Sequence, residues 1–318
     1  MKKNILKLIL CLSLIAAVIV LVKLRGIRID ERHFPDETLR RSVHRCDLDK
    51  NGYLSKKELE KATTLSVNSG CSDLSGIEYL TNLESISFSN DCPDLSGAEQ
   101  LTNLKKIELY NCEFSETFVF DNDIPITEFK CYFCIFKNGI RFRNDFVESV
   151  ELGYCGWGEC LASGDLVFAD CDKLSGFRAE FDPAEFDLEE SDSMQELSFN
   201  IDLSGCDSLD WLTITSDKEQ TITSVDLSNC SKLSTFYIYE WGFVGDNEKE
   251  LTLNISGSPN IEGAKISSKR IKELDISDCP HLISASEQTP SEERFVGLRY
   301  ESDDGWIEVK NEQLMFIK

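Results

Sequence analysis

Hydrophobic residues recur at a fixed spacing along most of the chain, beginning near residue 64. A phrase of the form L-x-x-L-x-L returns in "LTNLESISFSND", "LTNLKKIELYNC", "IPITEFKCYFC" and "DFVESVELGYC". The central strands of these phrases, and of an earlier one in "TLSVNSG", fall 21 or 22 residues apart, at Leu65, Ile86, Ile107, Phe129 and Val150. Such a period is typical of a solenoid, in which each turn buries its inward side chains by stacking on its neighbours. The pattern therefore predicts a mainly β solenoid, shaped as a curved rod.

The phrase changes in the second half of the chain, where two short strands alternate in each turn. Examples are "LVFADCDKLSGFRA", "IDLSGCDSLDWLTI", "VDLSNCSKLSTFYI", "LNISGSPNIEGAKI" and "LDISDCPHLISAS". If the second strand is the ladder strand, which pairs with its equivalent in the next turn, it lies at Phe177, Leu212, Phe236 and Ala264, with spacings of 35, 24 and 28 residues. These spacings predict insertions, and the largest, "FDPAEFDLEESDSMQELSFN", has room for one more turn.

A different pattern precedes the repeats, because "DLDKNGYLSKKE" (residues 47–58) matches the calcium-binding loop of an EF-hand. Such a loop takes oxygen ligands at positions 1, 3, 5, 7, 9 and 12, and has glycine at position 6 for a sharp turn. The corresponding ligands are Asp47, Asp49, Asn51, the Tyr53 carbonyl, Ser55 and Glu58, with Gly52 at the turn. The flanking segments "DETLRRSVHRC" and "SKKELEKATTL" have helical spacing, and Ser55 with Glu58 opens the second as a capping box.

The sequence therefore predicts a helix-loop-helix cap with one calcium site. Because the loop has no partner loop, we expect weak binding, in the range of about 0.1 to 1 mM found for extracellular modules. The second helix leads into the strand at Leu65, so the loop is expected to fix the cap to the first repeat. The alternative is a turn that only resembles a calcium loop, since Lys50, Lys56 and Lys57 reduce the local negative field.

The N-terminus, "MKKNILKLILCLSLIAAVIVLVKLRG", has the pattern of an export segment. Three lysines precede fifteen uncharged, mostly apolar residues, Leu8 to Val22, and Lys23 and Arg25 follow. The apolar length suits a signal peptide better than a full membrane span of roughly 20 residues. No A-x-A cleavage site follows it, so the sequence favours an uncleaved membrane anchor and leaves a cleaved signal peptide as the alternative.

These motifs together resemble the leucine-rich repeat proteins exported by Gram-positive bacteria, in particular internalin-like surface proteins whose repeats follow a calcium-loop segment. The matching stretches are "FPDETLRRSV" with "DLDKNGYLSKKE", then "SDLSGIEYLTNLESI" and the "LDISDC" phrases. The resemblance implies a leucine-rich repeat fold and a protein at the bacterial cell surface, held by its N-terminus or secreted if cleaved. It divides the chain into the export segment (1–28), the EF-hand-like cap (29–63), the repeats (64–286) and a C-terminal cap (287–318).

The charge of the chain narrows the range of partners. The formal net charge is -24, and the 290 residues after residue 28 hold 27 basic and 57 acidic side chains. An anionic partner is therefore disfavoured, and we expect no nucleic acid. Contact with a membrane is expected only through the apolar N-terminal segment.

Cysteine is unusually frequent, with 13 residues, which in an exported protein would ordinarily indicate disulfides. Nine of them recur at one phase of the repeat: Cys71, Cys92, Cys112, Cys134, Cys155, Cys171, Cys206, Cys230 and Cys279. Ser258 takes this place in "NISGSPNI". A small residue that tolerates burial and has a weak donor suits a position facing the backbone. The sequence therefore predicts a ladder of free thiols, and three histidines offer little for zinc binding or acid-base catalysis.

The residues between the inward positions of each strand are predicted to line the concave face of the solenoid. Aromatic residues gather there in successive turns, next to charged residues: Tyr110, Tyr132, Phe133 and Tyr154, with Glu108, Lys130 and Glu151. An aromatic patch with a polar border is typical of a surface that recognises a protein or a glycan. The alternative is an aromatic ladder that only stabilises neighbouring turns.

No phosphate-binding loop and no Ser-His-Asp or Cys-His arrangement is evident in the sequence, so we expect a protein that is not an enzyme. The predicted function is recognition or adhesion at the cell surface, with calcium as a structural ion. Two alternatives remain. One is a purely structural envelope spacer, and the other is a glycosidase on a β-solenoid, which needs two carboxylates facing each other on neighbouring turns.

Overall fold

The computed structural model of the chain describes residues 26–93, 95–121, 124–153, 160–162, 164–181, 197–217, 220–241, 249–268, 270–287, 298–301, 306–309 and 314–318. The chain divides into two compact units, Met1–Leu104 (unit 1) and Lys105–Lys318 (unit 2). The predicted export segment and membrane anchor lies outside the described residues, except for its last three positions. Within the ranges given above, no helix is long and apolar enough to cross a membrane.

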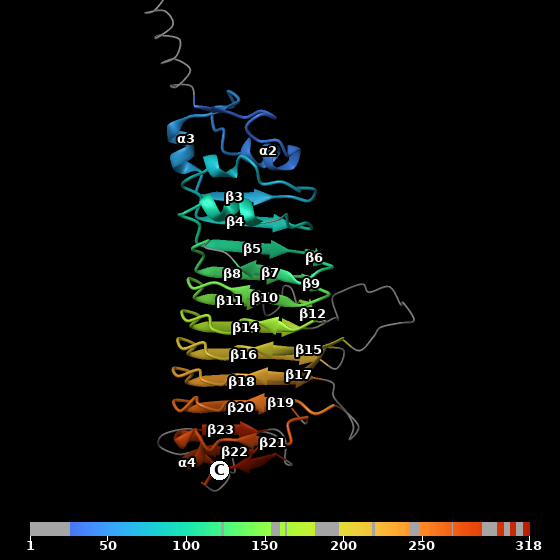
Figure 1. Cartoon of the computed structure of the whole chain (residues 1–318), viewed down its shortest axis with the longest axis vertical. Coiled ribbons are helices and arrows are strands. Elements are labelled where there is room, and N and C mark those ends of the chain that lie inside the picture. The colour runs from blue at the N-terminus through green and yellow to red at the C-terminus, as the bar shows by residue number, and fades with distance from the viewer. Residues whose placement is uncertain are drawn as a thin grey trace, which may run out of the picture. The chain divides into compact units, whose positions relative to one another are not determined.

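Unit 1 contains the helix-loop-helix segment and the first repeat strands (Figure 1). Its elements are β1 (Ile27–Arg28), α2 (Glu37–Val43), β2 (Tyr53–Leu54), α3 (Lys56–Lys61), β3 (Thr64–Val67), the 3-10 helix η1 (Ile77–Tyr79), β4 (Ser85–Ser89) and the 3-10 helix η2 (Leu95–Gln100). Both predicted helices are confirmed. Asp36 accepts hydrogen bonds from the first-turn N–H groups of α2, and Ser55 and Glu58 form the predicted capping box at the start of α3.

The repeat phase predicted for unit 1 is also confirmed. Strands β3 and β4 pair in parallel with Leu65 opposite Ile86, and both side chains are buried. The buried face of α2 is formed by Leu39 and Val43, which lie one helical turn apart. Inward side chains from the helix and the strands thus share one core within this unit.

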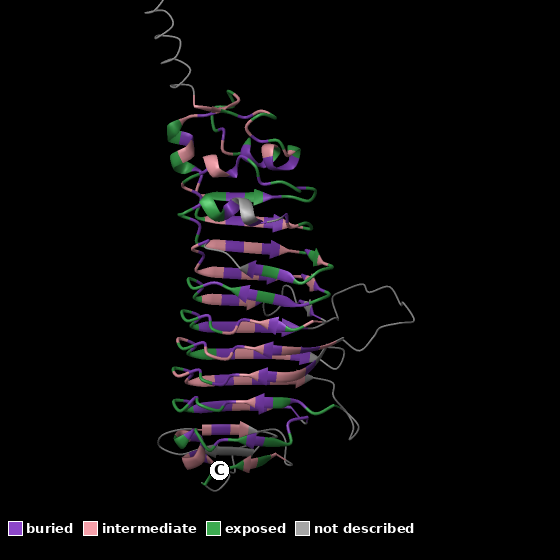
Figure 2. Cartoon of the chain, in the orientation of Figure 1, coloured by how far each residue is buried: buried purple, intermediate pink, exposed green. Residues whose placement is uncertain are grey.

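Unit 2 is a β-solenoid whose ladder strands stack in parallel (Figure 1). They are β5 (Lys106–Tyr110), β8 (Glu128–Tyr132), β11 (Ser149–Leu152), β14 (Gly176–Phe181), β16 (Trp211–Asp217), β18 (Thr235–Trp241), β20 (Gly263–Ser267) and β23 (Trp306–Val309). The register aligns Ile107, Phe129, Val150, Phe177, Leu212, Phe236 and Ala264, which confirms the predicted ladder positions. Buried and half-buried residues alternate along β5 and β8, so one set of side chains points inward and the other outward (Figure 2).

A second parallel sheet forms the other side of each turn in unit 2. Its strands are β7 (Phe118–Asp121), β10 (Ile140–Arg143), β13 (Leu166–Val167), β15 (Leu197–Asp202), β17 (Gln220–Asp226) and β19 (Thr252–Asn254). Three short strands, β6 (Glu113–Phe114), β9 (Ile135–Phe136) and β12 (Leu161–Ala162), pair separately. Phenylalanine rings from both sheets pack in the core. Phe142 of β10 stacks on Phe120 of β7, with the ring centroids 4.6 Å apart. The ring centroids of Phe142 and Phe129 of β8 are 5.0 Å apart.

The remaining elements of unit 2 follow the last repeats. They are β21 (Glu273–Asp275), α4 (Pro280–Ser286), β22 (Leu298–Glu301) and β24 (Met315–Ile317). Strand β22 pairs antiparallel with β23, and β24 pairs in parallel with β21. The final ladder strand of the described residues therefore has an antiparallel neighbour in place of another repeat.

One expectation about the repeat is wrong. Turns with two strands were expected in the second half of the chain, but β7 and β10 already form the second sheet in the earlier turns. The sequence left open whether the long insertion holds one more turn. Strand β14 pairs directly with β16, so no further ladder strand lies between them. Strand β15, at the end of that insertion, instead pairs with β13 and β17 of the second sheet.

The cysteine ladder is observed in unit 2. The thiols of Cys206 and Cys230 each donate to a backbone carbonyl of the preceding turn, at 3.2 Å. Ser258 occupies the same place, and its hydroxyl donates to the Leu227 carbonyl at 2.8 Å. No disulfide joins the cysteines in the described part of the chain, and Cys155 lies outside it. Burial raises the pKa of the Cys171 thiol to about 11 and that of the Cys230 thiol to about 12, so both are protonated at neutral pH.

Candidate functional site

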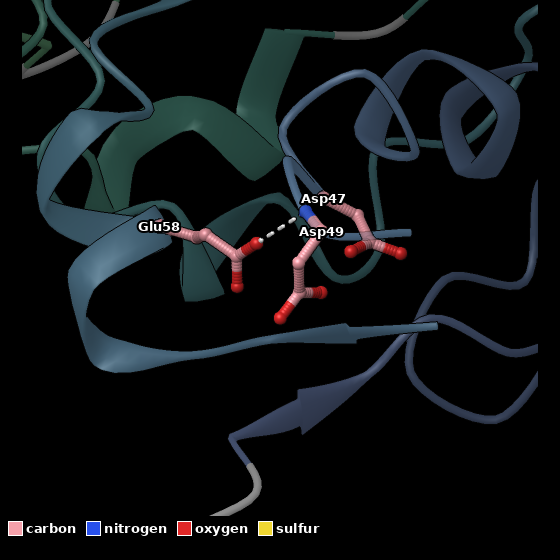
Figure 3. Close-up of side chains that lie close together, drawn as sticks. All are labelled: Asp47, Asp49 and Glu58. Carbon is pink, nitrogen blue, oxygen red and sulfur yellow. Dashed lines mark hydrogen bonds between the residues drawn. The ribbon is translucent and has the colours of Figure 1, made fainter. Parts of the chain in front are cut away.

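The loop between α2 and α3 brings three acidic side chains together. One carboxylate oxygen each from Asp47, Asp49 and Glu58 lies within 4.8 Å of the others, and Figure 3 shows the three side chains directed toward a common space. Asp47 and Glu58 are buried, while Asp49 is exposed. Three like charges at this separation repel each other, so the arrangement needs an explanation.

Backbone N–H groups hold the carboxylates in place. Asp47 accepts from the N–H of Gly52 at 2.8 Å and from that of Asn51 at 3.1 Å. Glu58 accepts from the N–H of Leu48 at 2.8 Å. Gly52 has a φ of +80°, which a residue with a side chain rarely adopts, so glycine at this position of the loop has a structural reason. The loop is therefore wrapped around the carboxylates of its first and last positions.

Glu58 serves two functions at once. One carboxylate oxygen accepts from the Ser55 hydroxyl at 2.7 Å and from the Ser55 N–H at 2.9 Å, while the other faces the loop. The hydrogen bond from the Ser55 side chain lowers the pKa of Glu58, and further backbone hydrogen bonds outweigh the opposing effect of burial. Glu58 therefore ties the start of α3 to the acidic group as an ionised carboxylate.

Asn51 and Tyr53, two further predicted ligands, lie on the same loop and contact other groups than Glu58 does. The Asn51 side chain donates to Asp49 at 2.9 Å and accepts from the Tyr53 N–H at 2.8 Å. Strand β2, which contains Tyr53, pairs antiparallel with β1, with Arg28 opposite Tyr53. The sequence did not predict this two-residue pairing. Strand β1 thus pairs with Tyr53 and Leu54, the seventh and eighth positions of the loop.

A second candidate region lies on the outward side of the ladder strands in unit 2. We call Glu108, Tyr110, Lys130, Tyr132, Phe133 and Glu151 the tyrosine surface. Tyr110 and Tyr132 are opposite each other on β5 and β8, and their rings stack at 5.1 Å with an interplanar angle of 20°. Both rings are half-buried, as predicted for outward positions flanked by neighbouring turns.

Charged groups surround this pair of rings. Lys130 lies between Glu108 and Glu151 in the register, and its Nζ is 3.0 Å from the Glu151 carboxylate. Burial lowers the pKa of Lys130, but the hydrogen bond and charge of Glu151 outweigh it, and the net shift is upward. Burial, and then the charge of Glu151, raises the pKa of Tyr132, whose hydroxyl donates to Glu151 at 3.4 Å.

This pairing bears on the glycosidase alternative. That alternative needs two carboxylates facing each other on neighbouring turns. In the register, Lys130 lies between Glu108 and Glu151, so these two carboxylates are not on neighbouring turns. Glu151 pairs with Lys130 at 3.0 Å, and Glu108 pairs with Lys106 at 2.8 Å.

Phe133 and Tyr154 are the last two aromatic residues predicted for this surface. Phe133 is half-buried and has a φ of +54°, a left-handed conformation that is unusual for a bulky residue. Asn111, at the same place after β5, has a φ of +53°. Tyr154 lies outside the described residues, so its place on the tyrosine surface stays a prediction.

The sequence did not single out two tryptophans on the same side of unit 2. Trp211 and Trp306 both occupy the first position of a ladder strand, on β16 and β23. The signal that could have revealed them is a glycine at the equivalent position of the preceding turn, Gly176 and Gly263. Variable insertions between these turns hide the alignment in the sequence.

Known proteins similar to this chain are found among solved structures, where three internalins match. No protein-family model matches this chain, and no curated protein sequence is significantly similar to it. Among solved structures, internalin C2 of Listeria monocytogenes is similar at 18% identity over 76% of this chain and 88% of its own, with a TM-score of 0.39. Internalin InlF of the same bacterium matches at 14% identity over 81% of this chain and 95% of its own, with a TM-score of 0.24. The functional domain of its InlJ, described as including a cysteine ladder, matches at 16% identity over 81% and 70%, with a TM-score of 0.19. At these TM-scores the similarity supports no inference about the function of this chain.

Proposed function

We propose that this chain is a non-enzymatic, exported recognition or adhesion protein that binds a protein or glycan partner at the bacterial cell surface. The observation that supports this proposal is the tyrosine surface, where two stacked, half-buried rings lie within a network of paired charges. Tyrosine offers a large apolar area and a polar hydroxyl at a low entropy cost, which is why it is enriched at recognition surfaces. Tyr154 is included in the proposed surface on the strength of its sequence position.

The same proposal includes a structural calcium ion in the loop of unit 1. The fit rests on the donor set, because calcium prefers oxygen ligands and three carboxylates lie within 4.8 Å of one another. Asp47, Asp49, Asn51, the Tyr53 carbonyl, Ser55 and Glu58 would hold the ion. Calcium would supply the positive charge that three converging carboxylates lack, and so would stabilise the loop between α2 and α3.

The N-terminal segment is proposed to hold the chain at the membrane, or to direct its secretion if it is cleaved. This part of the proposal rests on the sequence pattern alone. The acidic charge of the chain supports a partner other than nucleic acid.

The test of the recognition proposal begins with a binding screen. The full chain is screened against immobilised extracellular proteins and glycans, and each partner found is then titrated with the Tyr132→Ala variant. We expect affinity to fall about tenfold or more, because a central aromatic residue contributes strongly to a recognition surface. The melting temperature should change little, because the ring is only half-buried.

Phe146→Ala is the matched control, since Phe146 is an exposed aromatic residue, 37% accessible, outside the tyrosine surface. It should leave affinity unchanged. Full binding by Tyr132→Ala, or a melting temperature lowered far more than in the control, would indicate that the tyrosines only stabilise neighbouring turns.

A further inference from the structure

A second group of aromatic side chains lies on the outward side of the later ladder strands. We call Trp211, Tyr237, Tyr239 and Trp306 the tryptophan surface. Tyr237 and Tyr239 of β18 lie parallel at 6.4 Å, and Tyr237 approaches Trp306 of β23 at 6.1 Å. Trp211 of β16 is 38% exposed, a high value for a large apolar side chain. The four rings belong to three strands of one sheet.

Both tryptophans lean over a glycine of the preceding ladder strand. A Cβ atom built on Gly176 would lie 2.7 Å from Cε2 of Trp211, and one built on Gly263 would lie 2.5 Å from Cε2 of Trp306. Neither glycine has a positive φ, so the backbone conformation does not require glycine there. Glycine within a strand lowers stability relative to alanine, because it loses more conformational freedom on folding. What glycine provides at both positions is room for an indole ring.

This arrangement holds the two indoles at a defined separation. Trp211 and Trp306 occupy the same strand position, and three strand spacings separate β16 from β23. At about 4.8 Å per spacing the two rings repeat at roughly 14 Å. Each indole leans toward the strand before its own, so the separation between the two indoles stays close to that of their strands. The half-buried Thr235 lies between them in the register. Rings held in this way lose little freedom when a ligand binds.

Two ion pairs lie on the outward side of the strands around these rings. Arg178 lies 2.8 Å from Glu180, and Lys265 lies 3.1 Å from Glu308. The Lys265 ammonium also lies 5.8 Å from the centre of the Tyr239 ring. The charges of these strand positions are therefore balanced, while the exposed Asp210 and Glu262 directly precede Trp211 and Gly263. The half-buried side chains between the rings, Thr213 and Thr235, carry hydroxyl groups.

From these features we propose that the tryptophan surface binds a neutral, unbranched oligosaccharide that runs across the ladder strands and contacts both indoles. Sugar rings present apolar C–H faces that pack against aromatic rings, and hydroxyl groups that pair with threonine and tyrosine hydroxyls. A neutral ligand suits ladder strands on which Arg178 and Lys265 already pair with Glu180 and Glu308. A proline-rich peptide could also contact tryptophan, but the hydroxyl-rich border favours a sugar. The tryptophan surface is separate from the tyrosine surface. The oligosaccharide proposal does not depend on the proposed role of the tyrosine surface.

The experiment titrates the full chain by calorimetry with linear hexamers of β-1,4-linked glucose, β-1,4-linked N-acetylglucosamine and α-1,4-linked glucose. We expect at least one hexamer to bind and its disaccharide to bind far more weakly, because only the longer chain reaches both indoles. The bound hexamer should also protect tryptophan fluorescence from quenching by acrylamide. A sulfated heparin hexasaccharide and a proline-rich decapeptide complete the panel.

Substitutions then locate the site. Trp211→Ala and Trp306→Ala should each weaken binding of the hexamer about tenfold, whereas Phe146→Ala should not. Gly263→Ala retains both tryptophans but displaces one indole, so it should also weaken binding. Tyr132→Ala should leave hexamer binding intact, which separates this site from the tyrosine surface.

Two binding results would overturn the proposal: no neutral hexamer binds, or only the sulfated hexasaccharide or the peptide binds. Two results on the location of the site would also overturn it. A bound hexamer would fail to protect tryptophan fluorescence, or both tryptophan variants would bind the hexamer with unchanged affinity. The protection measurement uses the unaltered chain, so it decides the matter even if a variant fails to fold.

Discussion

The acidic loop of unit 1 and the outward side of the ladder strands in unit 2 use charge in opposite ways. In the loop, the carboxylates of Asp47, Asp49 and Glu58 converge within 4.8 Å, and backbone N–H groups orient them. On the ladder strands, Glu151 and Glu308 have lysine partners at 3.0 and 3.1 Å. Converging like charges gain from a cation supplied from outside, whereas paired charges gain nothing from one. On the paired surface, the aromatic rings are therefore the groups left to bind a partner.

The largest effect is expected from breaking a charge pair inside unit 2. The side chains of Arg270 and Glu240 are each 1% exposed and form an ion pair, and Arg270 also donates to the Ile222 carbonyl at 2.6 Å. Arg270→Met should lower the free energy of unfolding by about 3 to 5 kcal/mol, because Glu240 would be left buried without its partner. Urea denaturation followed by circular dichroism measures the loss.

Lys137→Met provides the control, because Lys137 pairs with Glu113 and both side chains are more than half exposed. Exposed pairs contribute about 0 to 1 kcal/mol, so the control should change little. Equal effects of the two substitutions would show that burial does not distinguish these pairs.

The next effect tests the converging charges of the loop. At about 1 mM calcium, a site with a dissociation constant of about 0.1 mM would stabilise the folded chain by about 1.4 kcal/mol. Melting of the full chain in calcium and in chelator should show this shift, and Asp49→Ala should abolish most of it. Glu60→Ala, on the exposed side of α3, should retain it. Identical melting curves with and without calcium would refute the calcium site.

The repeat phase could be predicted from the sequence because the inward positions of stacked turns must be apolar. Leucine, isoleucine, valine and phenylalanine mark those positions even where turns differ in length, which is why Val150 and Phe177 could be aligned before the register was known. The convergence of Asp47, Asp49 and Glu58 could be predicted because the spacing of a calcium-loop motif is fixed within twelve consecutive residues. In both cases the signal lies in a local stretch of chain.

The features that escaped prediction depend on contacts between distant residues. Strand β1 is two residues long, too short for any alternation, and only its pairing with β2 reveals it. The lean of Trp306 over Gly263 joins residues 43 positions apart, with an insertion between them. The buried pair of Arg270 and Glu240 looks like two ordinary surface charges in the sequence. All three depend on which strands lie side by side, which the sequence does not state.

A smaller effect concerns what holds the turns of unit 2 together. Cys230→Ser should change the free energy of unfolding by no more than about 1 kcal/mol, because Ser258 shows that a hydroxyl can take the place of the thiol in this ladder. Loss of a native disulfide would instead cost about 2 to 5 kcal/mol. Urea denaturation without reductant distinguishes the two results, and a loss in the larger range would contradict a ladder of free thiols.

The smallest effect is expected at Phe133. Substitution there tests whether the strained backbone at Phe133 is kept because its ring binds a partner. A left-handed conformation costs an ordinary residue about 1 to 2 kcal/mol, whereas asparagine adopts it readily, as Asn111 does after β5. Phe133→Asn should therefore stabilise the chain by roughly 0.5 kcal/mol, after the loss of contacts made by a half-buried ring. The reverse substitution, Asn111→Phe, should destabilise it. If Phe133→Asn raises the melting temperature and weakens partner binding, the phenyl ring serves recognition. A lowered melting temperature would show that it supports the packing of the turns.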